Sequence, residues 1–148
     1  MITFLKAEEQ HQHKNGGGWV ANTATVEESA YLGASAQVFG SAQVSGEACV
    51  YGSAWVFDNA CVYGSAQVFD NAKVSGNARV FHNALVYGSA RVFGDAQVSG
   101  DACVYGSAWV FGSALVSGDA LVFDNAWVTS NARVSGDARV FGEAWVSG

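Results

Sequence analysis

Twenty-one alanines stand at every sixth position from Ala24 to Ala144 without an exception. Valine stands two residues after the alanine at all nineteen sites from Val38 to Val146, and the same phase reaches back to Val20. A fixed short period predicts a solenoid, in which each repeat contacts only its neighbours. Function is therefore expected from residues that interrupt the repeat on the outer surface, and not from a pocket in the core.

Each hexad, such as VFDNAC at residues 56–61, alternates valine and alanine with other residues. Period-two alternation rich in β-branched side chains predicts short strands. The Gly or Asp that follows in each hexad predicts a corner, because these residues tolerate the left-handed backbone conformation. We expect twenty-two such units of strand and corner from Val20 to Val146.

The tryptophans set the number of hexads per coil. Trp19, Trp55, Trp109, Trp127 and Trp145 are separated by 36, 54, 18 and 18 residues, and every gap is a multiple of eighteen. This spacing predicts three hexads per coil and therefore a triangular prism. About seven coils, stacked as parallel strands about 4.8 Å apart, would make a rod about 35 Å long.

The expected fold class is all-β, a single-stranded parallel β-helix, with residues 1–18 as an N-terminal arm and cap and residues 19–148 as the helix. The A-x-V-x-G-x hexads resemble those of bacterial hexapeptide-repeat proteins over residues 16–148. The resemblance implies a left-handed parallel β-helix. The lead-in HKNGGGWVANTATVEESAYLG further resembles a subgroup of bacterial and prophage hexapeptide proteins.

The resemblance also raises the question of catalysis, because many hexapeptide-repeat proteins are acyltransferases with a histidine base and others are γ-class carbonic anhydrases. No loop interrupts the hexads here, and His82 is the sole histidine of the solenoid. It replaces a corner Gly or Asp, where histidine tolerates positive φ. We interpret His82 as a corner residue, with a catalytic base and a binding contact as the alternatives.

An anhydrase would need three histidines on zinc, two of them in the regular coils. His11 and His13 instead lie in the arm sequence EEQHQH at residues 8–13, which we interpret as a solvated polar segment. We therefore expect no enzymatic activity, no cofactor and no metal site.

The composition restricts the partners and the compartment. The formal net charge is -6, and from Val20 onward five basic residues face eleven acidic ones, which disfavours nucleic acid. The start MITFLKAEEQ lacks the features of a signal peptide, and no apolar run reaches membrane-spanning length. We expect a cytoplasmic or virion-associated protein. Cys49, Cys61 and Cys103 are odd in number and lack CxxC spacing, so we expect free thiols.

Residues on either side of each inward valine should point outward, and counting by eighteen sorts them into three walls. On the first wall the outward residues before valine are Trp19, Gln37, Trp55, Lys73, Arg91, Trp109, Trp127 and Trp145. Those after valine include Phe39, Phe57, Phe93 and Phe111. The third wall carries an unbroken ladder of Tyr51, Phe69, Tyr87, Tyr105, Phe123 and Phe141. The second wall carries serines, with Tyr63 and Phe81 as its aromatics.

Two interpretations of the aromatic columns remain open. Stacked rings can stabilise neighbouring coils by about 0.5 to 1.5 kcal/mol per pair beyond burial. Alternatively, nine aromatics on the first wall would exceed the few hundred Å² of apolar surface that a monomer normally exposes, and would bind a partner. Lys73 and Arg91 lie between Trp55 and Trp109, where cation–π stacking can keep the stripe continuous.

We expect a non-catalytic β-solenoid that serves as an assembly or binding module and forms a homo-oligomer, a trimer or a tip-to-tip dimer. A carbohydrate, stacked on aromatic faces, and a protein target are the other partners. With a protein target, the chain would act as an inhibitor, such as a phage-encoded inhibitory protein. The stacked Asp101, Asp119 and Asp137 would then give the rod one negatively charged corner. A hexapeptide-type acyltransferase with His82 as base is the enzymatic alternative.

The two tips of the rod are also predicted. Ile2, Phe4 and Leu5 are expected to cover the first coil, with residues 16–18, all glycine, letting the chain turn into it. No cap follows Val146 in the sequence, and exposed strand edges template further pairing. This tip is therefore expected to meet another subunit or a partner, with the alternative that the chain is a piece of a longer protein.

Overall fold

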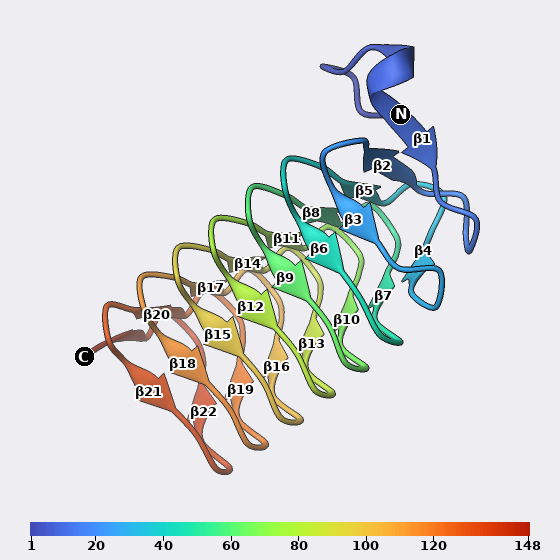
Figure 1. The fold of residues 1–148 in the computed structure, drawn as a ribbon. Helices are drawn as coiled ribbons and strands as arrows, with labels where there is room; N and C mark the ends of the chain where they lie inside the picture. Colours follow the sequence, from blue (N-terminus) through green and yellow to red (C-terminus); the bar gives the residue numbers. More distant parts are fainter.

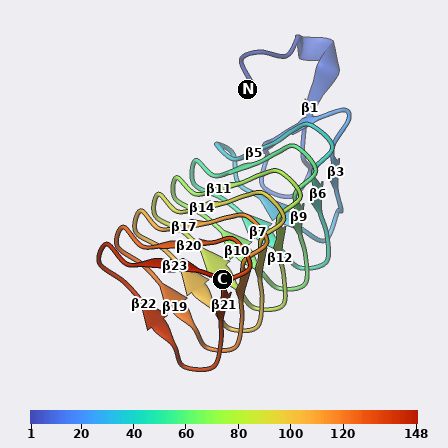
Figure 2. The ribbon, with the colours of Figure 1, turned by 90° about the vertical axis from the view of Figure 1, so that its left-hand side faces the viewer.

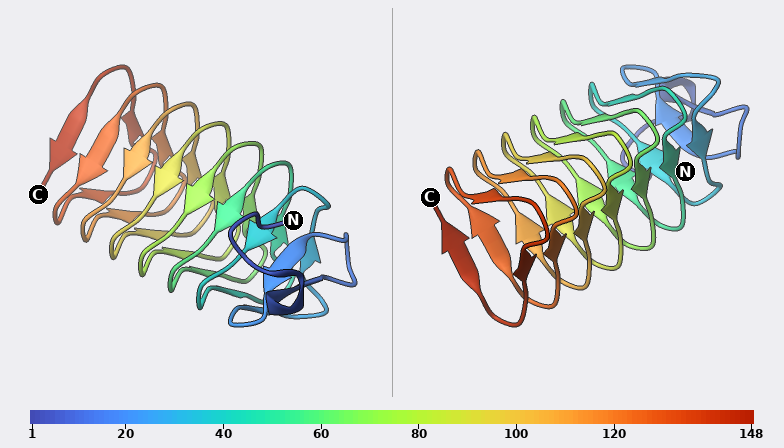
Figure 3. Two further views of the ribbon diagram at one scale, coloured as in Figure 1. Left: turned by 90° about the horizontal axis from the view of Figure 1, so that it is seen from above. Right: turned by 90° about the horizontal axis from the view of Figure 1, so that it is seen from below.

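The computed structural model describes residues 1–148 as one stack of coils with an N-terminal arm at one end (Figure 1). Three sheets form the walls of the stack, and the chain passes through each wall once per coil. The coils follow one another without an interrupting loop (Figure 2) and stay evenly spaced when seen from above and below (Figure 3). The predicted all-β parallel solenoid of about seven triangular coils is confirmed.

The first wall is a nine-stranded sheet. Its strands in spatial order are β1 (Gln10–Gln12), β2 (Trp19–Ala21), β5 (Gln37–Val38), β8 (Trp55–Val56), β11 (Lys73–Val74), β14 (Arg91–Val92), β17 (Trp109–Val110), β20 (Trp127–Thr129) and β23 (Trp145–Ser147). All pairs in it are parallel except β1 with β2, which is antiparallel.

The second and third walls are seven-stranded sheets. The second wall contains β3 (Thr25–Val26), β6 (Gln43–Val44), β9 (Cys61–Val62), β12 (Arg79–Val80), β15 (Gln97–Val98), β18 (Leu115–Val116) and β21 (Arg133–Val134). The third wall contains β4 (Tyr31–Leu32), β7 (Cys49–Val50), β10 (Gln67–Val68), β13 (Leu85–Val86), β16 (Cys103–Val104), β19 (Leu121–Val122) and β22 (Arg139–Val140). The single helical element is the 3-10 turn η1 (Ala7–Glu9).

The inward residues make one continuous core along the axis. From Ala30 to Val128 every lattice alanine and valine, together with Leu32, has 0% exposure. The register explains this burial: Lys73 pairs with Trp55 below and Arg91 above, so each residue lies over the one eighteen positions earlier. Valine therefore stacks on valine and alanine on alanine along the whole prism.

The corners depend on positive φ angles, and the coil spacing restricts which residues can supply them. Gly52 has φ 65°, and a Cβ added there would lie 2.8 Å from the backbone nitrogen of Asp70 in the next coil. Five corners carry a side chain at φ 58° to 59°, namely Asp58, Asp70, His82, Asp124 and Ser130. In each case the corners eighteen residues before and after are glycine, so no two corners with side chains stack on each other.

At three of these corners, the side chain forms a hydrogen bond with the backbone of the next coil. The Asp70 carboxylate accepts from the backbone N–H of Gly88 at 3.2 Å, and Asp58 and Asp124 accept in the same way from the glycines above them. Aspartate at such a corner therefore joins one coil to the next, while glycine leaves room for its neighbour.

The N-terminal arm is more ordered than its polar sequence suggests, and its interpretation as a solvated segment is wrong for two residues. Gln10 is 5% exposed, and its side chain accepts from the backbone N–H of Ile2 at 2.9 Å and donates to the carbonyls of Ile2 and Leu5. His13 is 7% exposed, and its ring lies 3.0 Å from the Ala30 carbonyl oxygen. These contacts fold the arm onto the first coil.

The predicted cap is correct for two of its three apolar residues. Ile2 is fully buried and Leu5 packs against the core. Phe4 does not cover the coil: it is 66% exposed, and its ring packs edge-on against Phe39 of the first wall, with centroids 5.2 Å apart. The cause is that the Gln10 side chain holds the backbone of residues 2–6 in a turn that leaves Phe4 outside.

Replacing Gly52 by alanine should lower the free energy of unfolding by about 1–3 kcal/mol, because it adds left-handed strain and a contact with the next coil. The matched control is Ser53→Ala at the neighbouring exposed corner position, which should change the stability by less than about 0.5 kcal/mol. Chemical denaturation measures both changes. Equal stability of the two variants would contradict the account of the corners.

Candidate functional site: the first wall

The indole column of the first wall forms a stack that runs along the rod. Trp109 and Trp127, on adjacent strands β17 and β20, have centroids 5.0 Å apart and an angle of 3° between their planes. Trp145 follows at 5.4 Å but is tilted by 59° and is 69% exposed. Within the stack the ring faces point along the axis and cover one another, so that the ring edges remain at the surface.

The two cations of this column make the contacts predicted for them. The Lys73 Nζ atom lies 4.5 Å from the ring centroid of Trp55, and the Arg91 Cζ atom lies 5.2 Å from that of Trp109. Lys73 and Arg91 are register partners on adjacent strands, yet they lean toward opposite ends of the column. Like-charge repulsion and attraction to the indole faces act in the same direction here, and the prediction of cation–π stacking is confirmed.

Beside the indoles, the phenyl rings form two stacked pairs. Phe39 and Phe57 have centroids 4.9 Å apart with planes at 6°, and Phe93 and Phe111 have centroids 4.9 Å apart with planes at 2°. Trp55 and Trp109 each pack edge-on between two successive phenyl rings, as Trp109 does with Phe93 at 5.8 Å and Phe111 at 6.3 Å. The two columns therefore interlock into one flat surface.

A shallow hollow interrupts this surface at the middle of the rod. It is lined by Phe57, Lys73, Ser75, Arg91 and Phe93. Ser75 occupies the position in the phenyl column where the strands on either side carry a phenylalanine. This hollow was not among the predicted sites, although a serine in a column of phenylalanines is the sequence signal that indicates it.

The ladder of the third wall is continuous, as predicted. Its five ring pairs, from Tyr51–Phe69 to Phe123–Phe141, have centroids 4.8 to 5.3 Å apart and nearly parallel planes. Burial raises the pKa of Tyr51 and of Tyr87, with smaller contributions from nearby cysteines and Asp70. The Tyr51 hydroxyl donates to the Gln67 side-chain carbonyl at 3.1 Å, which ties the ladder to the column beside it.

The second wall carries one stacked pair, Tyr63 and Phe81, at 5.0 Å. His82 follows Phe81 at a corner with φ 59°, so the predicted corner conformation is confirmed. The imidazole is exposed and packs edge-on against the Phe81 ring, with centroids 4.8 Å apart. Asp101, in the next coil, accepts a hydrogen bond from Asn83 at 2.9 Å.

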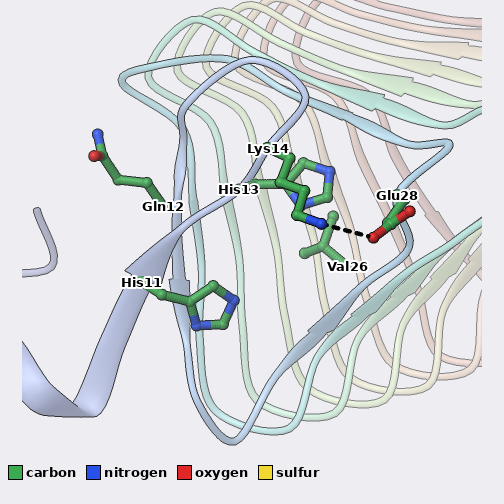
Figure 4. A pocket seen from close by; sticks show the side chains of 6 residues that line it. All are labelled: His11, Gln12, His13, Lys14, Val26 and Glu28. Atoms are coloured by element: carbon green, nitrogen blue, oxygen red, sulfur yellow. Dashed lines mark hydrogen bonds and ion pairs between the residues drawn. The ribbon is translucent and has the colours of Figure 1, made fainter.

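A second hollow lies between the arm and the first coil. Its lining is His11, Gln12, His13, Lys14, Val26 and Glu28 (Figure 4). The ion pair of Lys14 and Glu28, at 3.2 Å, closes one side, and both side chains are more than four-fifths exposed. The two histidines have separate partners, because His11 bonds Asn22 at 2.8 Å while His13 bonds the Ala30 carbonyl. No group of three metal-ligating side chains occurs in the chain.

The three walls and their short repeat define the class of this protein, a parallel β-solenoid. Four segments match the family model described as the YdcK Beta solenoid repeat, residues 42–57, 72–88, 96–112 and 132–148. Each segment begins on an inward alanine of the lattice. The chain is therefore a β-solenoid repeat protein. No curated protein and no solved structure matches the chain, and no helix is long and apolar enough to cross a membrane.

The three cysteines are free thiols, as predicted, and the pKa of Cys103 is raised, mainly by burial and further by Asp101. At pH 8 it should therefore react with a disulfide reagent more slowly than in the unfolded chain, because only the thiolate reacts. Asp101→Asn removes the nearby charge and should speed the reaction, whereas Asp119→Asn, one coil further, should not. Mass spectrometry of the labelled peptides measures each rate, and equal rates for all three proteins would contradict this cause.

Proposed function

We propose that this protein is a non-catalytic β-solenoid that serves as a binding or assembly module and self-associates through the first wall. The observation that carries the proposal is the set of nine indole and phenyl rings on seven of the nine strands of this wall, most of which interlock in stacked and edge-on pairs on both sides of the hollow. Apolar ring edges in such an arrangement lose contact with water when a second flat wall packs against them.

The electrostatics of the wall support the same proposal. Its two central cations already lie against indole rings, and neither forms an ion pair with a carboxylate. Burying them against a second copy therefore breaks no salt bridge.

We further propose that the coils are left-handed and of the hexapeptide type, and that the assembly is a trimer or a tip-to-tip dimer. The strands recur every six residues from β3 to β23, which supports a hexapeptide repeat. An aromatic wall that runs the full length of the rod favours side-by-side packing, as in a trimer, over contact between tips.

The double variant Trp109→Ser with Trp127→Ser should lower the mass measured by light scattering toward the 15.4 kDa of the single chain. We expect the dissociation constant for self-association to rise at least about tenfold, since two buried aromatic side chains are lost. The matched control is Tyr105→Ser with Phe123→Ser, which removes an equally stacked pair from the third wall. An unchanged mass in the first variant, or the same loss in both, would contradict the proposal.

A carbohydrate partner is the second binding hypothesis, because planar ring faces stack on sugars. The faces of Trp109 are occupied by Arg91 and Trp127, which leaves the exposed Trp145 as the main candidate on this wall. Glycan binding that survives Trp109→Ser with Trp127→Ser while the mass stays unchanged would favour sugar recognition. A protein target is the third binding hypothesis, and the acidic corner of Asp101, Asp119 and Asp137 is the part of the chain that would bind it.

The enzymatic alternative is a hexapeptide-type acyltransferase with His82 as the base. A general base needs a hydrogen-bonded position beside the group that it deprotonates, and the His82 ring packs on Phe81 at an exposed corner. Incubation with acetyl-CoA and a panel of amino sugars should give no thioester cleavage. Turnover that disappears in His82→Ala, with the fold retained, would overturn the non-catalytic proposal.

A further inference from the structure

The hollow in the first wall has the shape of one missing ring. Phe57 and Phe93 lie two strands apart, which corresponds to about 10 Å along the rod, with Ser75 on the strand between them. In the intact pairs on either side, neighbouring rings are 4.9 Å apart. A ring placed midway would therefore have the same spacing to both neighbours as the rings elsewhere in the column.

Here the faces of two rings, Phe57 and Phe93, oppose each other with the empty position at Ser75 between them, and this occurs at no other place in the three walls. The third-wall ladder is unbroken, and the second wall has a single stacked pair with serines beyond it. Ring faces that are free elsewhere, such as the outer faces of Tyr63 and Phe81, lie toward a serine with no second ring beyond it. A guest ring in the hollow would cover the free faces of both Phe57 and Phe93.

The charges around the hollow indicate what the guest ring should carry. In the intact part of the wall, Trp109 packs edge-on against the phenyl ring of its own strand and that of the preceding strand. By the same register, Lys73 and Arg91 take the two positions beside the empty place. The edge of a guest ring would therefore face two cations that have no carboxylate partner.

We propose that this hollow is a binding site for a planar aromatic ring that carries a carboxylate, such as a small aryl carboxylate. The ring stacks between Phe57 and Phe93, and its carboxylate accepts hydrogen bonds from Lys73 and Arg91. The serine hydroxyl forms the floor. This inference goes beyond self-association, and its readout is ligand binding at the hollow, not the mass of the protein.

The test uses benzoate as the probe and isothermal titration calorimetry with the full chain. Benzoate should bind, and benzamide, which has the same ring without the charge, should bind at least about tenfold more weakly. Ser75→Phe fills the empty position with the residue found on neighbouring strands and should weaken benzoate binding at least about tenfold. Ser117→Phe, the matched control on the second wall, should leave it unchanged.

The charge requirement is tested separately with Lys73→Gln combined with Arg91→Gln. This variant should bind benzoate only as weakly as it binds benzamide, while its near-ultraviolet circular dichroism shows that the rings remain stacked. Absence of benzoate binding, equal binding of benzoate and benzamide, or undiminished binding in Ser75→Phe would each overturn the inference. Because the hollow lies on the wall proposed for self-association, the titrations are made at a dilution where light scattering shows a single chain, so that no second copy covers the hollow. The failure of one proposal is then distinguishable from the failure of the other.

Discussion

The backbone hydrogen bonds between successive coils are the interaction on which the rest of the structure depends. Phe57 donates to the Val74 carbonyl at 3.0 Å, and the same bond recurs with nearly the same length along each wall. Because these bonds join equivalent positions of consecutive coils, identical or similar side chains come to lie over one another. Core, corners and surface columns all follow from this one register.

The register has opposite consequences inside and outside the prism. Inside, space is limited, so the lattice repeats every six residues, and its alanines and valines have 0% exposure from Ala30 to Val128. Outside, the residues are free to vary, and what matters is the column that recurs every eighteen residues. Stacked indoles, cations over indoles and the empty position at Ser75 are properties of columns, which no single hexad contains.

The sequence predicted the parts of the structure that repeat. Counting by eighteen from the tryptophans gave the coil, the three walls and the stacking of Lys73 and Arg91 on indoles, because side-chain alternation and register determine these. The arm was predicted less well, since the burial of Gln10 and His13 depends on bonds to Ile2 and Ala30 that no period encodes. The hollow at Ser75 also depends on Lys73 and Arg91, whose side chains lean away from each other. The sequence does not determine the directions of these side chains.

The central claim is that the inner six-residue lattice determines the fold, whereas the outer eighteen-residue columns determine self-association. Two deletions test this claim most directly. Removing residues 115–132 takes out one coil and brings Trp145 over Trp109, whereas removing residues 115–120 keeps the inner lattice but moves Trp127 and Trp145 onto another wall. The account predicts that both proteins unfold cooperatively and that light scattering shows loss of self-association only for the six-residue deletion. An associated state of unchanged size after that deletion, or failure of it to fold, would contradict the account.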